Sequence, residues 1–123
     1  MADRTLHNCR VLVVEDDYML ADDLVTELGD FGAVVIGPAG TVEDAIALIT
    51  AEPHIDGVVL DVNLRGEMAF PVADLLAERN VPFVFTTGYD AGVFPTRFAH
   101  APRCYKPISM AHVTEAIGRL IRA

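Results

Sequence analysis

Acidic side chains and a single lysine are the residues of this chain whose types and spacing suggest chemistry. Lys106 is the only lysine, in a sequence with 18 acidic residues and a formal net charge of -9. The run Glu15-Asp16-Asp17 ends one apolar stretch, and Asp61 ends another. Carboxylates that share a cleft repel each other unless a cation relieves them, and their hard oxygens suit Mg²⁺. An aspartate beside Mg²⁺ and an ammonium group can attack a phosphoryl group.

The composition limits the classes of protein that the chain can represent. Its 123 residues, 52% of them apolar, suffice for one domain with a buried core. No apolar run approaches the roughly 18 residues that a membrane span needs, and residues 1–10 lack the apolar centre of a secretory signal. The acidic balance argues against binding nucleic acid. We therefore expect a cytoplasmic single-domain protein without an output domain, a membrane contact or a nucleic-acid partner.

Apolar patterns along the chain alternate between two periods. Short runs rich in β-branched or aromatic residues are typical of strands buried on both faces, whereas apolar residues one turn apart indicate helices. The strand-like runs lie at Arg10–Val14, 33–36, 55–60, 82–86 and Arg103–Tyr105. Strands that alternate with helices predict an α/β protein with a flavodoxin-like (βα)5 doubly wound parallel sheet in the order 2-1-3-4-5.

Local signals place the helices and their ends. A leucine stripe over residues 18–28 predicts the first helix, which Gly29 and Gly32 are expected to end. Gly37-Pro38 is expected to end the second strand. Three later helices have a capping residue or a first-turn proline, at Thr41, Pro71 and Ser109. Residues 90–101 have poor helical spacing, so we expect any fourth helix there to be short or mobile.

The predicted topology brings the polar residues together. In open parallel sheets, ligands bind beyond the carboxyl ends of the strands, where the strand order reverses. This order places Asp16 and Asp61 side by side, with Thr87 and Lys106 after the next two strands. Each residue alone has a plainer interpretation, as a helix cap, a turn residue, a strand residue or a solvated charge. Their combination at four strand ends favours a site.

With these motifs, the sequence resembles the receiver domain of bacterial two-component response regulators. The resemblance covers about residues 10–122 of a domain spanning 1–123. It rests on four motifs, which are Val13-Val14-Glu15-Asp16-Asp17, Leu60-Asp61-Val62-Asn63-Leu64, Thr87-Gly88 and Lys106-Pro107. It implies that Asp61 is the phosphoacceptor, that Thr87 bonds a phosphoryl oxygen, and that Lys106 contacts the phosphoryl group.

The resemblance also implies a metal site and a mode of action. Glu15, Asp16, Asp61 and the backbone carbonyl of Asn63 match the positions that hold Mg²⁺, whereas Asp17 is an additional acid. The implied protein is not an enzyme in the usual sense. It phosphorylates itself from phosphohistidine with Mg²⁺ and dephosphorylates slowly. Its partners are a sensor histidine kinase or a histidine phosphotransfer protein, and a downstream protein target.

Two details refine the resemblance. Residues 85–89, Phe-Thr-Thr-Gly-Tyr, resemble the Phe-Ala-Thr-Gly motif of single-domain regulators associated with HWE-type histidine kinases, with Thr86 in place of alanine. Arg103 stands where most receivers have Tyr or Phe, so we expect switching to depend on Thr87, Tyr89 and residues 90–101. Tyr89 and Asn63 are expected to border the path of the hydrolytic water. Phosphorelay, phosphate sink and adaptor roles remain open.

Three other functions compete with a phosphoacceptor role. A dehalogenase-type phosphatase also uses an aspartate after a strand, but usually has a second acid where this chain has Asn63. A nucleotide- or flavin-binding domain would have a glycine-rich turn in place of Glu15-Asp16-Asp17. A pseudo-receiver that only binds partners would not need the complete set of Asp16, Asp61, Thr87 and Lys106.

Overall fold

Five parallel strands form the centre of the protein. The structure is a computed structural model that describes residues 6–88 and 93–123. The strand order is β2-β1-β3-β6-β7, which confirms the predicted α/β doubly wound topology. In that order the strands are β2 (Val34–Ala39), β1 (Arg10–Val14), β3 (Gly57–Asp61), β6 (Phe83–Thr87) and β7 (Arg103–Tyr105).

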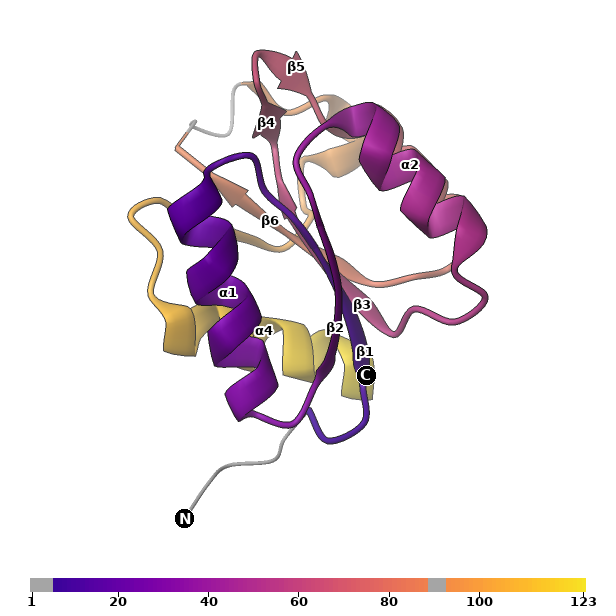
Figure 1. Cartoon of the computed structure of the whole chain (residues 1–123). Coiled ribbons are helices and arrows are strands. Elements are labelled where there is room, and N and C mark those ends of the chain that lie inside the picture. Colours follow the sequence, from indigo (N-terminus) through magenta and orange to yellow (C-terminus); the bar gives the residue numbers. More distant parts are fainter. Residues whose placement is uncertain (1–5, 89–92) are drawn as a thin grey trace.

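Helices cover both faces of this sheet. Figure 1 shows α1 and α4 on one side and α2 on the other. The helices are α1 (Tyr18–Asp30), α2 (Val42–Ala51), α3 (Phe70–Glu78) and α4 (Met110–Arg122). Val11, Val13 and Val59 pack under α1 and α4, whereas Leu12 and Leu60 pack under α2 and α3. Alternate residues of one strand thus fill two cores, as expected for a sheet buried on both faces.

The predicted caps position the helices. The hydroxyl of Thr41 accepts a hydrogen bond from the backbone N–H of Asp44 at 3.0 Å, and Ser109 does the same for His112 at 3.3 Å. Pro71 lies in the first turn of α3, where its missing N–H costs no helical hydrogen bond. No helix among residues 6–88 and 93–123 is long and apolar enough to cross a membrane.

Some predicted boundaries were wrong. Gly29 lies inside α1, which continues to Asp30, and only Gly32, with φ of 96°, follows the helix end. Gly37-Pro38 does not end β2, because the strand bulges there and continues to Ala39. β2 is an edge strand, where a proline removes no essential ladder hydrogen bond.

Two short elements lie in the connections between the main strands, a hairpin after β3 and a 3₁₀ turn before β7. The strands β4 (Asn63–Leu64) and β5 (Glu67–Met68) form a hairpin that the sequence patterns did not predict. Among residues 93–101, the longest described helical element is the 3₁₀ turn η2 (Thr96–Phe98). The expectation of a short fourth helix holds for that part, whereas Tyr89 and residues 90–92 lie outside the described residues.

Candidate functional site

The carboxyl ends of β1, β3, β6 and β7 meet at one polar cleft. Val14, the last residue of β1, lies beside Leu60 of β3, and Asp61, the last residue of β3, lies beside Thr86 of β6. A cavity of about 500 Å³ opens at these ends. Its lining residues are Asp16, Asp17, Asp61, Asn63, Arg65, Gly66, Gly88 and Lys106. Asp16, Asp61 and Lys106, from three of the four predicted strand ends, thus line one cavity. The fourth strand end, which carries Thr87, contributes the next residue, Gly88.

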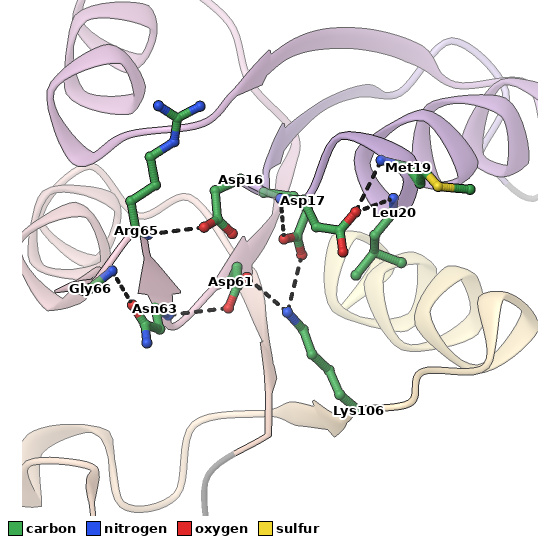
Figure 2. Close-up of polar contacts among 10 residues, drawn as sticks. Asp16, Asp17, Met19, Leu20, Asp61, Asn63, Arg65, Gly66 and Lys106 are labelled. Carbon is green, nitrogen blue, oxygen red and sulfur yellow. Dashed lines mark hydrogen bonds and ion pairs between the residues drawn. The ribbon is translucent and has the colours of Figure 1, made fainter.

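Lys106 provides the positive charge of the cleft. Its ammonium Nζ donates a hydrogen bond to Asp61 Oδ2 at 2.9 Å and lies 3.5 Å from Glu15 Oε1. Figure 2 shows the lysine reaching toward Asp61 from the end of β7. Desolvation acts to lower the pKa of Lys106, but the hydrogen bond to Asp61 and the two carboxylate charges raise the pKa above its ordinary value. The lysine therefore stays protonated at neutral pH.

Glu15 does not line the cavity but lies next to it, close to Lys106 and Asp61. The residue is buried, and its Oε2 accepts a hydrogen bond from the backbone N–H of Asp17 at 3.0 Å. Its Oε1 is also buried and makes no regular hydrogen bond within the described part of the chain. Burial away from water raises the pKa of Glu15 to about 8, and the neighbouring Asp61 carboxyl adds to the rise. This carboxyl group is poorly compensated by protein groups alone.

Asp16 completes a cluster of three carboxylates. One carboxylate oxygen each from Glu15, Asp16 and Asp61 lies within 4.8 Å of the others. Oδ2 of Asp16 accepts a hydrogen bond from the backbone N–H of Arg65 at 3.0 Å. Desolvation acts to raise the pKa of Asp16, but that hydrogen bond and the Glu15 side chain lower the pKa overall. Asp16 is thus stabilised as an anion facing the cleft.

Asp17 and Asn63 have local structural roles at the rim. Asp17 caps α1, because its Oδ1 accepts hydrogen bonds from the backbone N–H groups of Met19 and Leu20 at 3.0 and 3.1 Å (Figure 2). The backbone N–H of Asn63 donates to Asp61 Oδ1 at 3.1 Å. Asp61 is only 3% exposed, so the contacts from Lys106 and Asn63 fix the orientation of its carboxylate.

Thr87 lies behind the cleft rather than in its lining. The residue is fully buried at the end of β6, and its carbonyl accepts a hydrogen bond from the backbone N–H of Lys106 at 2.8 Å. That bond ties the strand end that carries Thr87 to the one that carries Lys106. Gly88, the next residue, lines the cavity. Tyr89 was predicted to border the water path, and it falls outside the described residues.

Arg65 is the site residue that the sequence analysis missed. It forms the turn of the β4–β5 hairpin with Gly66, and both residues have positive φ, 54° and 86°. Within the turn, the backbone N–H of Gly66 donates a hydrogen bond to Asn63 Oδ1 at 2.8 Å. Positive φ at both central residues is typical of a two-residue hairpin turn. The glycine was the one available signal, since arginine does not favour this conformation.

The arrangement fits a divalent cation. Three carboxyl groups face one ammonium group, and the raised pKa of Glu15, about 8, shows that the protein alone does not stabilise all three as anions. The buried Oε1 of Glu15 also makes no regular hydrogen bond within residues 6–88 and 93–123. Hard oxygen donors of this kind suit Mg²⁺. Asp61 is held beside a cation and opens to a cavity, as a nucleophile toward a phosphoryl group would be.

Comparison with known proteins identifies the family. No family model matches the chain. The solution structure of SdrG from Sphingomonas melonis Fr1 is 37% identical, with 93% of this chain and 97% of that chain covered, and a TM-score of 0.79. The crystal structure of a response regulator receiver protein from Sinorhizobium medicae WSM419 is 25% identical, with 96% and 98% covered, and a TM-score of 0.81.

A curated relative gives the same result over part of the chain. The sensory transduction protein LytT from Bacillus cereus is 38% identical over 85 residues, which are 66% of this chain. The chain spans 34% of the length of that relative. The sheet order, the cluster of Glu15, Asp16 and Asp61, and the similarity to SdrG over nearly its full length agree. The chain belongs to the receiver domains of response regulators.

Proposed function

We propose that the chain accepts a phosphoryl group on Asp61 from the phosphohistidine of a sensor kinase, and that it signals by phosphorelay transfer or by phosphorylation-dependent protein binding. One observation carries the proposal. The nearly buried carboxylate of Asp61 lies 2.9 Å from the only lysine of the chain and within 4.8 Å of two further carboxylates. This grouping adds little to folding stability, since like charges repel, but it suits phosphoryl transfer.

The proposed step is an in-line displacement at phosphorus. An oxygen of the Asp61 carboxylate forms a bond to phosphorus while the bond from phosphorus to the histidine nitrogen breaks. The electron pair of that bond goes to the imidazole, which takes up a proton and leaves as neutral histidine. The Lys106 ammonium transfers its hydrogen bond from Asp61 to a phosphoryl oxygen and neutralises charge that builds up there. Thr87 would donate its hydroxyl to another phosphoryl oxygen.

Mg²⁺ is the proposed cofactor. The carboxylates of Glu15, Asp16 and Asp61 and the backbone carbonyl of Asn63 would hold it. Bound there, the metal would neutralise charge on the transferring oxygens. A cation would also relieve the repulsion within the cluster and compensate the buried oxygen of Glu15.

The surface beside the cleft supports a protein partner. Tyr18 and Met19 at the start of α1 are 86% and 76% exposed, although both are large and apolar. Next to them lies a groove of about 400 Å³ that extends to the loop after β7. Its lining residues are Asp17, Met19, Leu20, Asp23, Lys106, Pro107, Ile108 and Met110. An apolar helix of a sensor kinase, such as one of the HWE type, or of a histidine phosphotransfer protein could deliver phosphohistidine from this side.

The intact mass of the protein tests the phosphoacceptor. We expect incubation with acetyl phosphate and Mg²⁺ to add about 80 Da, one phosphoryl group, to the wild type. Asp61→Asn should gain nothing, whereas Asp22→Asn, an exposed acid on α1, should behave like the wild type. If acetyl phosphate fails, a phosphorylated histidine kinase replaces it as donor. Absence of labelling from either donor, or equal labelling of Asp61→Asn, would contradict the proposal.

A further inference from the structure

Arg103 makes an unusual set of contacts outside the cleft. This residue of β7 is half-buried, and its guanidinium donates hydrogen bonds to three backbone carbonyls of the segment that precedes it. Nη2 donates to Phe98 O at 2.8 Å and to Ala99 O at 3.0 Å, and Nε donates to Ala101 O at 3.2 Å. One planar side chain therefore holds the carbonyls at the end of the 3₁₀ turn η2 and just after it.

The same guanidinium also stacks on an aromatic ring. Cζ of Arg103 lies 3.8 Å from the centroid of the Phe94 ring, a distance at which a cation is attracted to the ring face. Phe94 is buried and packs edge-on against Phe85 and Phe70, with centroids 5.1 and 5.7 Å apart. Arg103 thereby connects both ends of residues 94–101 to the strand that carries it, β7, whose end leads into Lys106.

The position of Arg103 relates these contacts to the cleft. Arg103 pairs in register with Phe85, and Phe85 lies on β6 two residues before Thr87. After Thr87 and Gly88, the chain is next described at Val93 and Phe94, beside the guanidinium. Phe94, on which Arg103 stacks, is thus the first aromatic residue that the structure describes after Thr87.

The described contacts of Arg103 do not include a carboxylate. Its described partners are neutral carbonyls and a ring, and its buried Nη1 makes no hydrogen bond within residues 6–88 and 93–123. Such a group is held by geometry rather than by an opposite charge. Because one planar group makes all of these interactions, a displacement of the turn or of Phe94 weakens them together. Interactions that break in concert favour two discrete arrangements over gradual deformation.

We propose that Arg103 is a latch that holds residues 94–101 in the arrangement of the unphosphorylated protein and releases them when Asp61 is phosphorylated. The release step rests on the function proposed above. In this chain a guanidinium performs the coupling between the strand before Lys106 and the segment after Thr87. Residues 94–101 then become the surface that a partner distinguishes between the two states.

The test compares amide hydrogen exchange and NMR shifts of Arg103→Ala with those of the wild type, first without a phosphoryl donor. We expect the amides of Phe98, Ala99 and Ala101 to exchange at least about tenfold faster in the variant, because their segment opens locally more often. Their shifts should move toward those of the phosphorylated wild type. Exchange in β1 and β3 should not change, which separates release of the segment from unfolding.

Two further variants keep the test decisive. Arg103→Lys retains the charge and stem but not the planar fork, so it should shift the same amides in the same direction by less. Arg119→Ala removes an exposed arginine of α4 and should change none of them. Unchanged exchange in both Arg103 variants, or an equal change in Arg119→Ala, would overturn the latch. Failure of wild-type Asp61 to take up a phosphoryl group would instead overturn the proposed function and the release step.

Discussion

Charged side chains have different roles in the cleft around Asp61 and in the segment from Val93 to Tyr105, which includes residues 94–101 and Arg103. In the cleft, three carboxylates face a single ammonium group, and a buried oxygen of Glu15 lacks a regular hydrogen bond within the described chain. In the segment, Arg97 pairs with Asp74 of α3 at 2.8 Å, and Arg103 is held by three carbonyls and a ring. Surplus charge in the cleft is available for chemistry, whereas charge in the segment is used for structure.

This difference gives opposite expectations for substitutions. Replacing a residue of the cleft should reduce phosphoryl chemistry while leaving the fold intact. Replacing a residue of the segment should reduce stability or loosen the segment, while the chemistry at Asp61 persists. A substitution in the segment that abolished the chemistry at Asp61 would contradict this division.

The largest expected effect is on stability, from the aromatic cluster under the segment. Phe98 is buried, stacks on Phe70 at 5.9 Å and meets Phe85 edge-on at 5.8 Å. We expect Phe98→Ala to lower the free energy of unfolding by about 3–5 kcal/mol, measured by urea denaturation. Below the unfolding transition, Mg²⁺-dependent labelling of Asp61 should persist. Loss of labelling in the folded variant would show that the chemistry at Asp61 depends on the packing of Phe98.

Removal of the lysine should have the largest effect on chemistry. Lys106→Met leaves Asp61 and Glu15 without their ammonium partner. We expect the initial rate of labelling by acetyl phosphate to fall roughly 100-fold or more, the loss typical of one electrostatic contact to a transition state. Circular dichroism should report an unchanged fold. Arg119→Met is the matched control, and a similar fall in that variant would assign the effect to net charge.

Loss of the Asp16 carboxylate should weaken Mg²⁺ binding and cost a little stability. For Asp16→Asn we expect Mg²⁺ affinity to fall at least about tenfold, because replacing even a residue that only orients a metal ligand typically weakens metal binding by that factor. Without Mg²⁺, the same variant should unfold at a slightly lower temperature at neutral pH, because the folded protein stabilises the Asp16 anion through the N–H of Arg65 and thereby lowers its pKa. Titration calorimetry and a thermal melt measure the two effects. If affinity falls but the melting temperature rises, repulsion within the cluster outweighs the hydrogen bond from the N–H of Arg65.

The cleft could be predicted from the sequence because topology converts chain position into spatial position. A residue that follows a strand of a parallel sheet lies at the carboxyl edge, so Glu15, Asp16, Asp61 and Lys106 could be grouped before any coordinates. Because these residues are three acids and one lysine, they pointed to Mg²⁺ binding and attack on a phosphoryl group. The same reasoning placed Thr87 at this edge, but burial behind the cleft depends on packing that the pattern does not encode.

The segment and the hairpin could not be predicted in this way. The acceptors for Arg103 are backbone carbonyls, which every residue has and no sequence pattern marks. The sequence showed only a charged residue at an unusual position. Arg65 likewise binds Asp16 through its backbone N–H, so its side chain gave no signal. Glycines were similarly ambiguous, since Gly29 continued a helix and Gly37 bent a strand without ending it.

The smallest effect is expected from the other arginine of the segment. Arg97 donates two hydrogen bonds to the exposed carboxylate of Asp74, and this contact lowers the pKa of Asp74. A carboxyl group whose pKa is lower in the folded state stabilises the protein above its unfolded pKa, and that contribution is lost as pH falls through the folded value. Asp74→Asn should therefore lower the melting temperature slightly at neutral pH.

That difference between wild type and Asp74→Asn should disappear once the pH falls below the ordinary range of an aspartate carboxyl, and it should shrink in about 1 M salt, where exposed charges are screened. Thermal melts across pH and salt measure both dependences. A difference that survives acid and salt would mean that Asp74 holds the segment by packing rather than by charge. If Asp74→Asn lowered the melting temperature as much as Arg103→Ala does, residues 94–101 would be held mainly by α3 rather than by β7, because Arg97 and Arg103 tie these residues to different elements.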